Sequence, residues 1–155
     1  MHTEEEAAGL AAARRMFDAD EASAGLGIEL VELAPGRAVA RMTVAASMLN
    51  GHAIGHGGYV FLLADTAFAL ACNSHGPVTV AAGADISFLA PVAEGDVLTA
   101  TAVERVRSGR SGIYDVTVTR GVHSSGVSGN RDQRGAPAEQ IVAEFRGRSR
   151  VVTGR

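Results

Sequence analysis

The sequence contains no lysine, no tryptophan and a single cysteine, and these absences exclude several kinds of protein. All 14 basic residues other than histidine are arginine, a skew that we attribute to codon bias rather than to phosphate binding. With Cys72 alone, no disulfide can form within the chain. Aromatic residues make up 5% of the chain and the formal net charge is −3, so neither base stacking nor a basic surface predicts binding to nucleic acid.

A long apolar run is missing as well. Residues 59–72 form the longest, but Asp65 interrupts it and it is too short to span a bilayer, so we expect no membrane partner. The first ten residues are acidic where a secretory signal would be basic, and we therefore expect a cytoplasmic protein. The 155 residues, of which 46% are hydrophobic, suit one buried core, and we predict a single domain over residues 1–155.

Two segments have the pattern of helices. Residues 4–20 contain good helix formers with apolar side chains on one stripe, which predicts a helical N-terminal segment within residues 1–20. Residues 59–73 are apolar almost all round, which predicts a central helix that is buried on most sides. Gly76 and Pro77 end this helix.

Strand-like segments lie on both sides of the central helix in the sequence. Their bounds are 28–34, 37–44, 78–89, 96–107, 112–122 and 140–152. The connection 123–139 is polar and predicts a long surface loop. One long helix with about six antiparallel strands is an α+β arrangement. Because the helix is too apolar to leave one side in water, we predict that a second copy of the chain covers it.

Asp65 is the one charged residue in the predicted central helix. Its neighbours Leu62, Leu63, Ala67 and Phe68 offer no charge partner, so burial should raise the pKa of its carboxyl group. Such a carboxylate can act as a general base on water or as a nucleophile towards an activated acyl group. An aspartate that hydrogen-bonds a nearby backbone or hydroxyl group, in this chain or in a second copy, fits the same pattern.

The segment 50–58, NGHAIGHGG, precedes the helix and is rich in glycine and histidine. Glycines let the backbone approach a ligand closely, and the N–H groups at the start of a helix attract negative charge. Gly57 could therefore donate a hydrogen bond to a carbonyl oxygen that becomes an oxyanion. A helix entry that requires unusual backbone dihedrals is the alternative explanation.

Gly57 and Asp65 are eight residues apart, which corresponds to about 12 Å along a helix. They cannot both contact one scissile carbonyl group from the same chain. An antiparallel helix of a second copy would place the Asp65 of one chain opposite the Gly57 of the other. The spacing therefore predicts a homodimer that builds the active site.

No other group of residues has the spacing of a familiar catalytic or metal site. His52 and His56 are four residues apart but stand among glycines, and the sequence has neither an HExxH pattern nor a cysteine cluster, so we expect no metal. A serine triad is equally unsupported. Arg146 and Arg148 could hold the phosphates of a nucleotide-bearing substrate, or could be solvated charges on a strand face.

The run NGHAIGHGGYVFLLADTAFALACNS, residues 50–74, resembles the signature of hotdog-fold thioesterases of the phenylacetic acid degradation (PaaI) type. The segments ADISFLAPVAEGDVLTATA, SGIYDVTV and VAEFRGRSRVV follow in the family's order, so the resemblance covers residues 16–152. It implies a hotdog fold, dimers whose sheets join, and usually a homotetramer formed from two dimers. It also implies hydrolysis of acyl-coenzyme A thioesters without metal or organic cofactor, coenzyme A being part of the substrate.

The family's pattern also assigns catalytic roles to four residues. Asp65 matches the acidic catalytic residue, and Gly57 matches the backbone donor that polarises the thioester carbonyl. Asn50 matches the polar residue near the reacting sulfur or water, and His56 helps to shape the loop.

The expected contacts with the substrate are Gly58, Tyr59, Phe88, Arg146 and Arg148. The two arginines are assigned to the nucleotide end of coenzyme A.

The chain departs from the family on the strand that follows the central helix. Some relatives have a hydroxyl residue there that positions the water, whereas residues 81–84 of this chain are alanine and glycine. Thr79 and Ser87 are the nearest alternatives. The connection 123–139 also looks longer than the family's usual hairpin.

We therefore expect an acyl-CoA thioesterase that acts on phenylacetyl-CoA or hydroxyphenylacetyl-CoA and has a role in phenylacetate degradation. Medium-chain acyl groups are an alternative. A hotdog module that binds acyl-CoA and regulates another protein without catalysis is a second alternative, although it would not need a desolvated carboxylate. An acyl-thioester dehydratase on the same fold would need a differently placed His and Asp pair, which we do not find.

Overall fold

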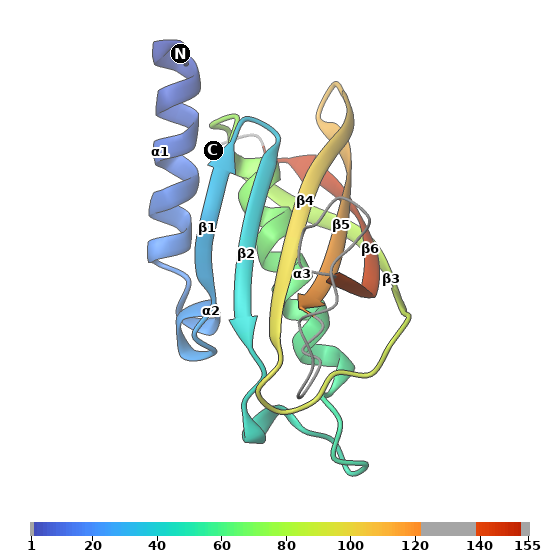
Figure 1. Cartoon of the computed structure of the whole chain (residues 1–155). Coiled ribbons are helices and arrows are strands. Elements are labelled where there is room, and N and C mark those ends of the chain that lie inside the picture. The colour runs from blue at the N-terminus through green and yellow to red at the C-terminus, as the bar shows by residue number, and fades with distance from the viewer. Residues whose placement is uncertain (1, 122–138, 153–155) are drawn as a thin grey trace.

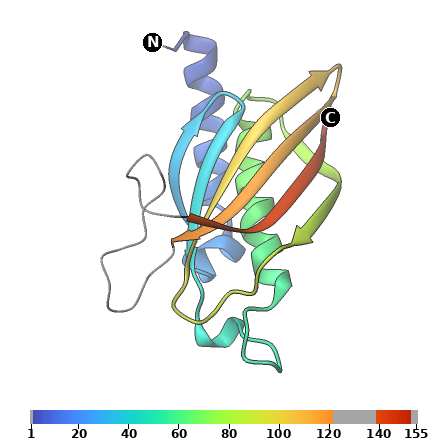
Figure 2. The same cartoon turned by 45° about the vertical axis from the view of Figure 1, so that its right-hand side comes forward.

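The computed structural model describes residues 2–121 and 139–152, in which a curved antiparallel sheet wraps around one long helix, α3 (Gly57–Asn73) (Figures 1 and 2). The helix packs against strands of the sheet along its length, with its apolar side chains between them. The predicted central helix and surrounding sheet are confirmed. The predicted surface loop 123–139 lies outside the described residues except for Glu139, where the last strand begins.

Six strands of the described part of the chain form a single sheet, in agreement with the prediction of about six. In chain order they are β1 (Glu29–Ala34), β2 (Arg37–Thr43), β3 (Thr79–Phe88), β4 (Val97–Ser108), β5 (Ser111–Gly121) and β6 (Glu139–Val151). Their order across the sheet is β1-β2-β4-β5-β6-β3, and all neighbouring pairs are antiparallel. Strands β1 and β3 are therefore the two edges, and β3 carries the chain directly from α3 to the far side of the sheet.

The predicted N-terminal helix within residues 1–20 is confirmed, and a second, short helix follows it. Helix α1 (Glu4–Asp18) begins with a capping box in which Thr3 Oγ1 accepts the Glu6 N–H and Glu6 Oε2 accepts the Thr3 N–H, at 3.1 and 2.9 Å. The chain then turns at Asp20 into the short helix α2 (Glu21–Gly25), which the sequence pattern did not reveal. Both helices pack against α3.

Close packing between α3 and β6 depends on a glycine. A side chain at Gly147 would lie 2.8 Å from the ring of Phe68, so the strand can approach the helix only without one. The Phe68 ring packs against the rings of Tyr114 and Phe145, with centroids 5.5 and 5.8 Å apart. These buried rings fix the position of α3 on the sheet and therefore the position of its first turn.

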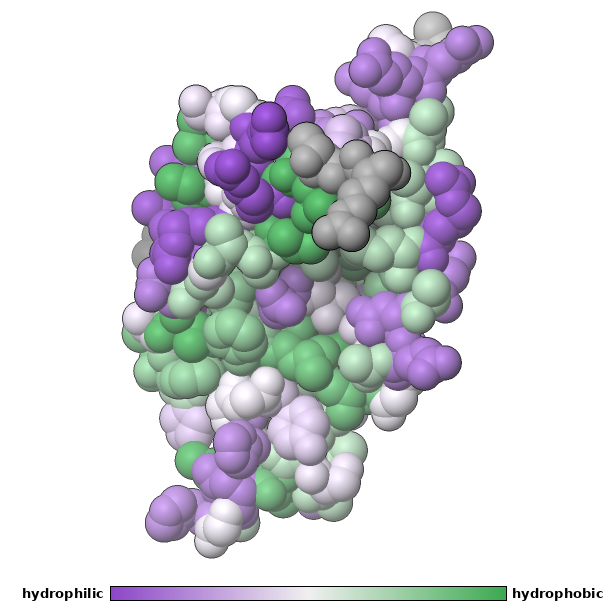
Figure 3. All heavy atoms as spheres, turned by 180° about the vertical axis from the view of Figure 1, so that it is seen from behind, coloured by the Kyte–Doolittle hydropathy of each residue, from purple (hydrophilic) through white to green (hydrophobic). Residues whose placement is uncertain are grey.

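One stripe of α3 is less buried than the rest. Gly58 is exposed and Leu62, Asp65 and Ala69 are partly exposed, whereas Leu63 and the residues on its side of the helix are fully buried. Figure 3 shows the face behind the view of Figure 1, where apolar side chains gather around the middle of the molecule. No helix among the described residues is long and apolar enough to cross a membrane.

Candidate active site

The first turn of α3 presents a backbone donor. His56 caps the helix: its Nδ1 accepts the Gly58 N–H at 3.1 Å and its carbonyl oxygen accepts the Tyr59 N–H at 3.0 Å. The His56 N–H in turn donates to the Met48 carbonyl oxygen at 2.7 Å, which anchors the preceding loop. Within the described residues, the Gly57 N–H has no acceptor. It is therefore available to a ligand at the positive end of the helix dipole.

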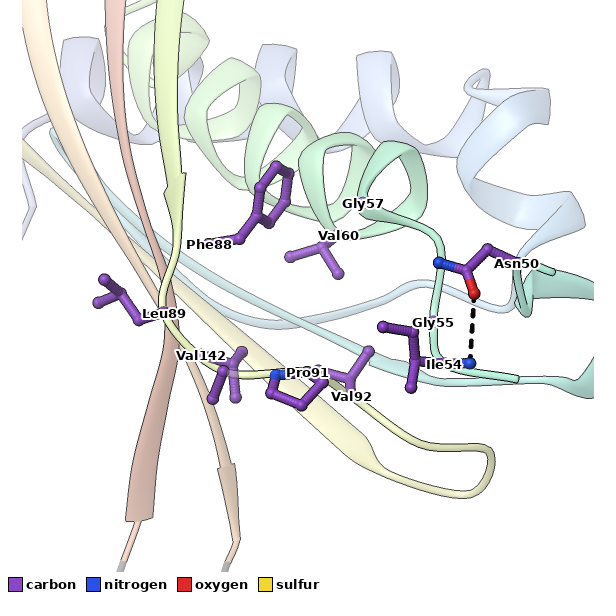
Figure 4. Close-up of a pocket in the computed structure, with 11 residues that line it drawn as sticks. Asn50, Ile54, Gly55, Gly57, Val60, Phe88, Leu89, Pro91, Val92 and Val142 are labelled. Carbon is purple, nitrogen blue, oxygen red and sulfur yellow. Dashed lines mark hydrogen bonds between the residues drawn. The ribbon is translucent and has the colours of Figure 1, made fainter. Parts of the chain in front are cut away.

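Asn50 lies in the loop before this turn, and its amide has a defined orientation. The Oδ1 atom accepts the N–H groups of His52 and Ile54 at 2.9 and 3.4 Å. Figure 4 shows the oxygen directed at Ile54 and the nitrogen on the other side of the amide. Because the oxygen is engaged by the loop, Asn50 can offer a ligand its two N–H groups, and it serves as a donor rather than an acceptor.

A pocket of about 400 Å³ lies beside the Gly57 N–H. Its walls come from the loop before α3, the first turn of α3, the segment after β3 and the start of β6 (Figure 4). The lining residues are Asn50, Ile54, Gly55, Gly57, Val60, Phe88, Leu89, Ala90, Pro91, Val92 and Val142. Its size is that of a small-molecule site, and Asn50 is the one polar side chain among these residues.

Gly57 allows the Phe88 ring to lie directly against the start of α3. A Cβ atom at residue 57 would lie 2.8 Å from Cζ of the Phe88 ring, and the same ring lines the pocket. The absence of a side chain thus lets the ring lie against the helix start and leaves the N–H uncovered. Three of the predicted site residues, Asn50, Gly57 and Phe88, are brought together here.

Asp65 lies two turns further along α3, on the less buried stripe and not among the pocket residues. Burial raises the pKa of its carboxyl group, and the negative charge of Asp20 raises it further. No described residue donates a hydrogen bond to this carboxylate, so the alternative of a structural aspartate held within its own chain finds no support there.

Asp20 is a neighbour of the site that sequence reasoning missed. Its carboxylate caps α2 by accepting the Ser23 N–H at 3.0 Å and the Ser23 hydroxyl at 2.6 Å. The Ser23 hydroxyl lies 2.9 Å from the hydroxyl of Thr66, the residue after Asp65. An aspartate just before Glu21 is a recognisable helix N-cap, but its proximity to α3 depends on tertiary packing.

The predicted arginines do not line the pocket. Arg146 forms a two-pronged ion pair with Asp115, with Nε–Oδ1 and Nη2–Oδ2 distances of 2.7 and 2.9 Å. Arg148 donates to Asp85 Oδ2 at 2.8 Å. Both arginines are exposed and alternate along β6 with buried residues that face α3, so they lie on the outer side of the sheet.

The remaining predicted residues lie in different parts of the structure, some at the start of α3 and others on β3. Gly58 is exposed on the first turn of α3, and the partly buried Tyr59 ring meets the His56 ring edge to face at 6.4 Å. Thr79 is buried and its hydroxyl donates to the Pro77 carbonyl oxygen at 2.9 Å, so it closes the turn after α3. Ser87 is exposed on β3. Among the described residues, no group of three or more metal-binding side chains comes together.

The fold and the site define a class of protein, and comparisons with known proteins agree. A family model described as the thioesterase superfamily matches residues 52–126. The acyl-coenzyme A thioesterase PaaI of Escherichia coli (strain K12) is 42% identical over 142 residues, which cover 92% of this chain and 90% of the relative. The chain belongs to the thioesterase superfamily, and the predicted resemblance to PaaI-type thioesterases is confirmed.

Solved structures support the same fold. The E. coli PaaI protein from the phenylacetic acid degradation operon matches with a TM-score of 0.81 and 39% identity, over 97% of this chain and 98% of that chain. A hypothetical thioesterase from Streptococcus pneumoniae TIGR4, solved with coenzyme A, matches with a TM-score of 0.72 and 26% identity, over 91% and 98% of the two chains. The protein is a hotdog-fold thioester hydrolase.

Proposed function

We propose that the protein hydrolyses acyl-coenzyme A thioesters, with phenylacetyl-CoA or hydroxyphenylacetyl-CoA as the substrate, and so takes part in phenylacetate degradation. The observation that carries this proposal is the Gly57 N–H, which has no acceptor among the described residues and borders an apolar pocket. The E. coli relative is an acyl-coenzyme A thioesterase from the phenylacetic acid degradation operon, and the pneumococcal relative was solved with coenzyme A, which supports this substrate.

In the proposed reaction, the thioester carbonyl oxygen accepts the Gly57 N–H, which stabilises the negative charge of the tetrahedral intermediate. Asp65 of a second copy takes a proton from water as the water oxygen bonds to the carbonyl carbon. The carbon–sulfur bond then breaks, and the proton passes to the coenzyme A thiolate. Direct attack by the Asp65 carboxylate, followed by hydrolysis of the mixed anhydride, uses the same residues.

Asn50 complements these two groups. Because its oxygen is held by the N–H groups of His52 and Ile54, its nitrogen is the atom offered to the pocket. An N–H donor there can stabilise the leaving thiolate or orient the attacking water, but it cannot act as a base.

Gly57 and Asp65 are about 12 Å apart along one helix, so they cannot meet within one chain. A homodimer would bring Asp65 of one copy close to Gly57 of the other. Strand β3 is an edge of the sheet, so its outer backbone groups can pair with another strand. Val80 and Phe88 on this strand are 47% and 55% exposed, so their apolar surface is open to contact with a second copy. We propose that β3 pairs with β3 of a second copy, and that two such dimers form a tetramer.

Arg148 is our candidate for the phosphates of coenzyme A, with Arg146 beside it. Its partner Asp85 belongs to the edge strand β3, so the guanidinium lies near the proposed dimer junction. A phosphate could replace the exposed Asp85 carboxylate as its partner, because guanidinium groups bind both in the same geometry.

A medium-chain acyl-CoA is the second candidate substrate, because the pocket is apolar and would accept any apolar acyl group of suitable size. A panel of acetyl-, phenylacetyl-, hydroxyphenylacetyl-, hexanoyl- and octanoyl-CoA, with release of free thiol as the readout, tests the proposal. We expect the highest kcat/KM for the arylacetyl thioesters. If the folded protein hydrolyses none of these thioesters, the proposed function is wrong.

A further inference from the structure

Three buried valines from separate parts of the chain line the pocket, and two of them, Val92 and Val142, form the valine wall that faces α3 across it. Val60 comes from α3, Val92 from the segment after β3 and Val142 from β6, and they are 4%, 3% and 1% exposed. Figure 4 shows Val142 and Val92 on the side of the pocket opposite the first turn of α3. A valine side chain has few accessible rotamers, so this wall has little freedom to deform.

The segment 89–92, which carries much of the wall, is held at both ends. The N–H groups of Leu89 and Ala90 donate to the Val142 carbonyl oxygen at 2.8 and 3.3 Å. Further along, Gly55 N–H donates to the Val92 carbonyl oxygen at 2.7 Å. The segment therefore joins β6 to the loop before α3, and the pocket cannot widen without breaking these backbone bonds.

Two further contacts restrict the same segment. The Arg120 guanidinium donates to the Pro91 carbonyl oxygen and to Asp96 Oδ2, both at 2.8 Å. A Cβ atom at Gly55 would collide with Cγ2 of Val92, so the valine already fills all the space on that side. The valine wall is thus held in place, and Asn50 supplies the one polar side chain of the pocket lining.

We propose that the valine wall, and Val142 in particular, sets the length of the acyl group and selects compact apolar groups such as arylacetyl over linear chains. This inference rests on the proposed thioesterase function. A longer chain would have to displace the wall, and an acyl group with a second carboxylate would bury a charge among residues that offer no counter-charge. Val142 thus determines specificity without taking part in the chemical step.

The test compares Val142→Ala with Val118→Ala. Val118 is a fully buried valine on β5 that does not line the pocket, so its substitution removes the same atoms elsewhere. In Val142→Ala we expect the ratio of kcat/KM for octanoyl-CoA to that for phenylacetyl-CoA to rise by about tenfold, because pockets discriminate methylene groups to this extent. In Val118→Ala the ratio should remain that of the wild type.

A second variant makes the side chain at position 142 larger instead of smaller. Val142→Ile adds one methyl group, and we expect kcat/KM for phenylacetyl-CoA to fall while acetyl-CoA hydrolysis is retained. If Val142→Ala is active but its ratio of kcat/KM for octanoyl-CoA to that for phenylacetyl-CoA equals the wild-type ratio, the inference is wrong. The proposed function would remain intact. If the wild type hydrolyses no thioester, the proposed function fails. Binding of hydrolysis-resistant thioether analogues of both substrates, measured by calorimetry on the same variants, would then decide the inference independently.

Discussion

In the proposed mechanism, the Asp65 carboxyl group determines how activity depends on pH. Its pKa is raised by burial and then by the charge of Asp20, whose carboxylate caps α2. A general base or nucleophile must be ionised, so activity should rise with pH through the pKa of Asp65. Removal of the Asp20 charge should lower this pKa.

We therefore predict that Asp20→Asn moves the acidic limb of the kcat/KM–pH profile to lower pH. Asparagine caps helices as well as aspartate does, so α2 should be retained. Glu21→Gln removes an exposed charge from the same helix and serves as the control. An acidic limb at the wild-type position in Asp20→Asn would show that Asp20 does not tune the catalytic carboxylate.

We expect the ionised Asp65 carboxylate to lower the stability of the folded protein as well. The pKa of Asp65 in the folded state lies above its unfolded value of 3.8, so ionisation of this carboxyl group lowers the stability of the fold. The full loss of stability applies at pH values above the folded-state pKa, and there is no loss at pH values below 3.8. We predict that Asp65→Asn raises Tm at neutral pH, with a gain that vanishes as the pH falls below 3.8, while hydrolysis falls at least about a hundredfold. A lower Tm together with wild-type turnover would contradict both roles.

At the scale of elements, a polar cluster ties the C-terminal end of α3 to two strands. Glu104 of β4 lies 2.6 Å from His75 Nε2 and accepts the hydroxyl of the buried Tyr114 of β5 at 3.0 Å. Burial alone would raise the pKa of Glu104, but the hydrogen bonds from His75 and Tyr114 and the charge of Arg107 outweigh it and lower the pKa. Burial and Glu104 together raise the pKa of Tyr114.

A lowered pKa means that Glu104 stabilises the fold above its unfolded value of 4.5, and that this contribution is lost as the pH falls through the folded pKa. We predict that Glu104→Gln lowers the free energy of unfolding by about 1–3 kcal/mol at neutral pH and by less in acid. Urea unfolding at both pH values measures this, with the exposed Glu94→Gln as the control. An equal loss at both pH values would mean that the charge is not responsible.

The elements themselves could be predicted where their pattern is local. The strands alternate in polarity and the central helix was placed to within two residues, its start being at Gly57 because His56 caps it. The five-residue helix α2 was missed, since it is too short for hydrophobic periodicity. The pairing of β3 with β6 could not be predicted from local patterns, because the fifty residues 89–138 separate the two strands.

The same distinction applies to the site. Asn50, Gly57 and Phe88 were predicted and meet at one pocket, with Asn50 and Gly57 in a single motif. Val142 and Asp20 were not predicted, because each reaches its neighbours through the tertiary fold. Composition and periodicity carry no information on such contacts.

The proposed active site requires that two whole molecules form a dimer joined at the β3 edge. We predict that Val80→Glu, which puts a charge on this 47%-exposed edge position, produces monomers and abolishes hydrolysis. Val31→Glu at the opposite edge, on a position 50% exposed, should keep both the dimer and the activity. Analytical ultracentrifugation with activity assays on the same samples measures this, and an active monomer would rule out a shared site.

Hybrid dimers test the central claim, which is that Asp65 of one copy works with Gly57 of the other. One tagged copy carries Asp65→Ala, and a second, differently tagged copy carries Gly57→Pro, which removes the N–H at a helix position that tolerates proline. The exposed Phe88 ring has room to move away from the proline. Each parent homodimer should be inactive, and the hybrid, isolated by both tags, is assayed with phenylacetyl-CoA.

We expect the hybrid to regain activity, because one of its two sites combines an intact Gly57 from the first copy with an intact Asp65 from the second. If both residues acted from the same chain, every site in the hybrid would carry one defect. A hybrid as inactive as its parents would therefore contradict the shared active site.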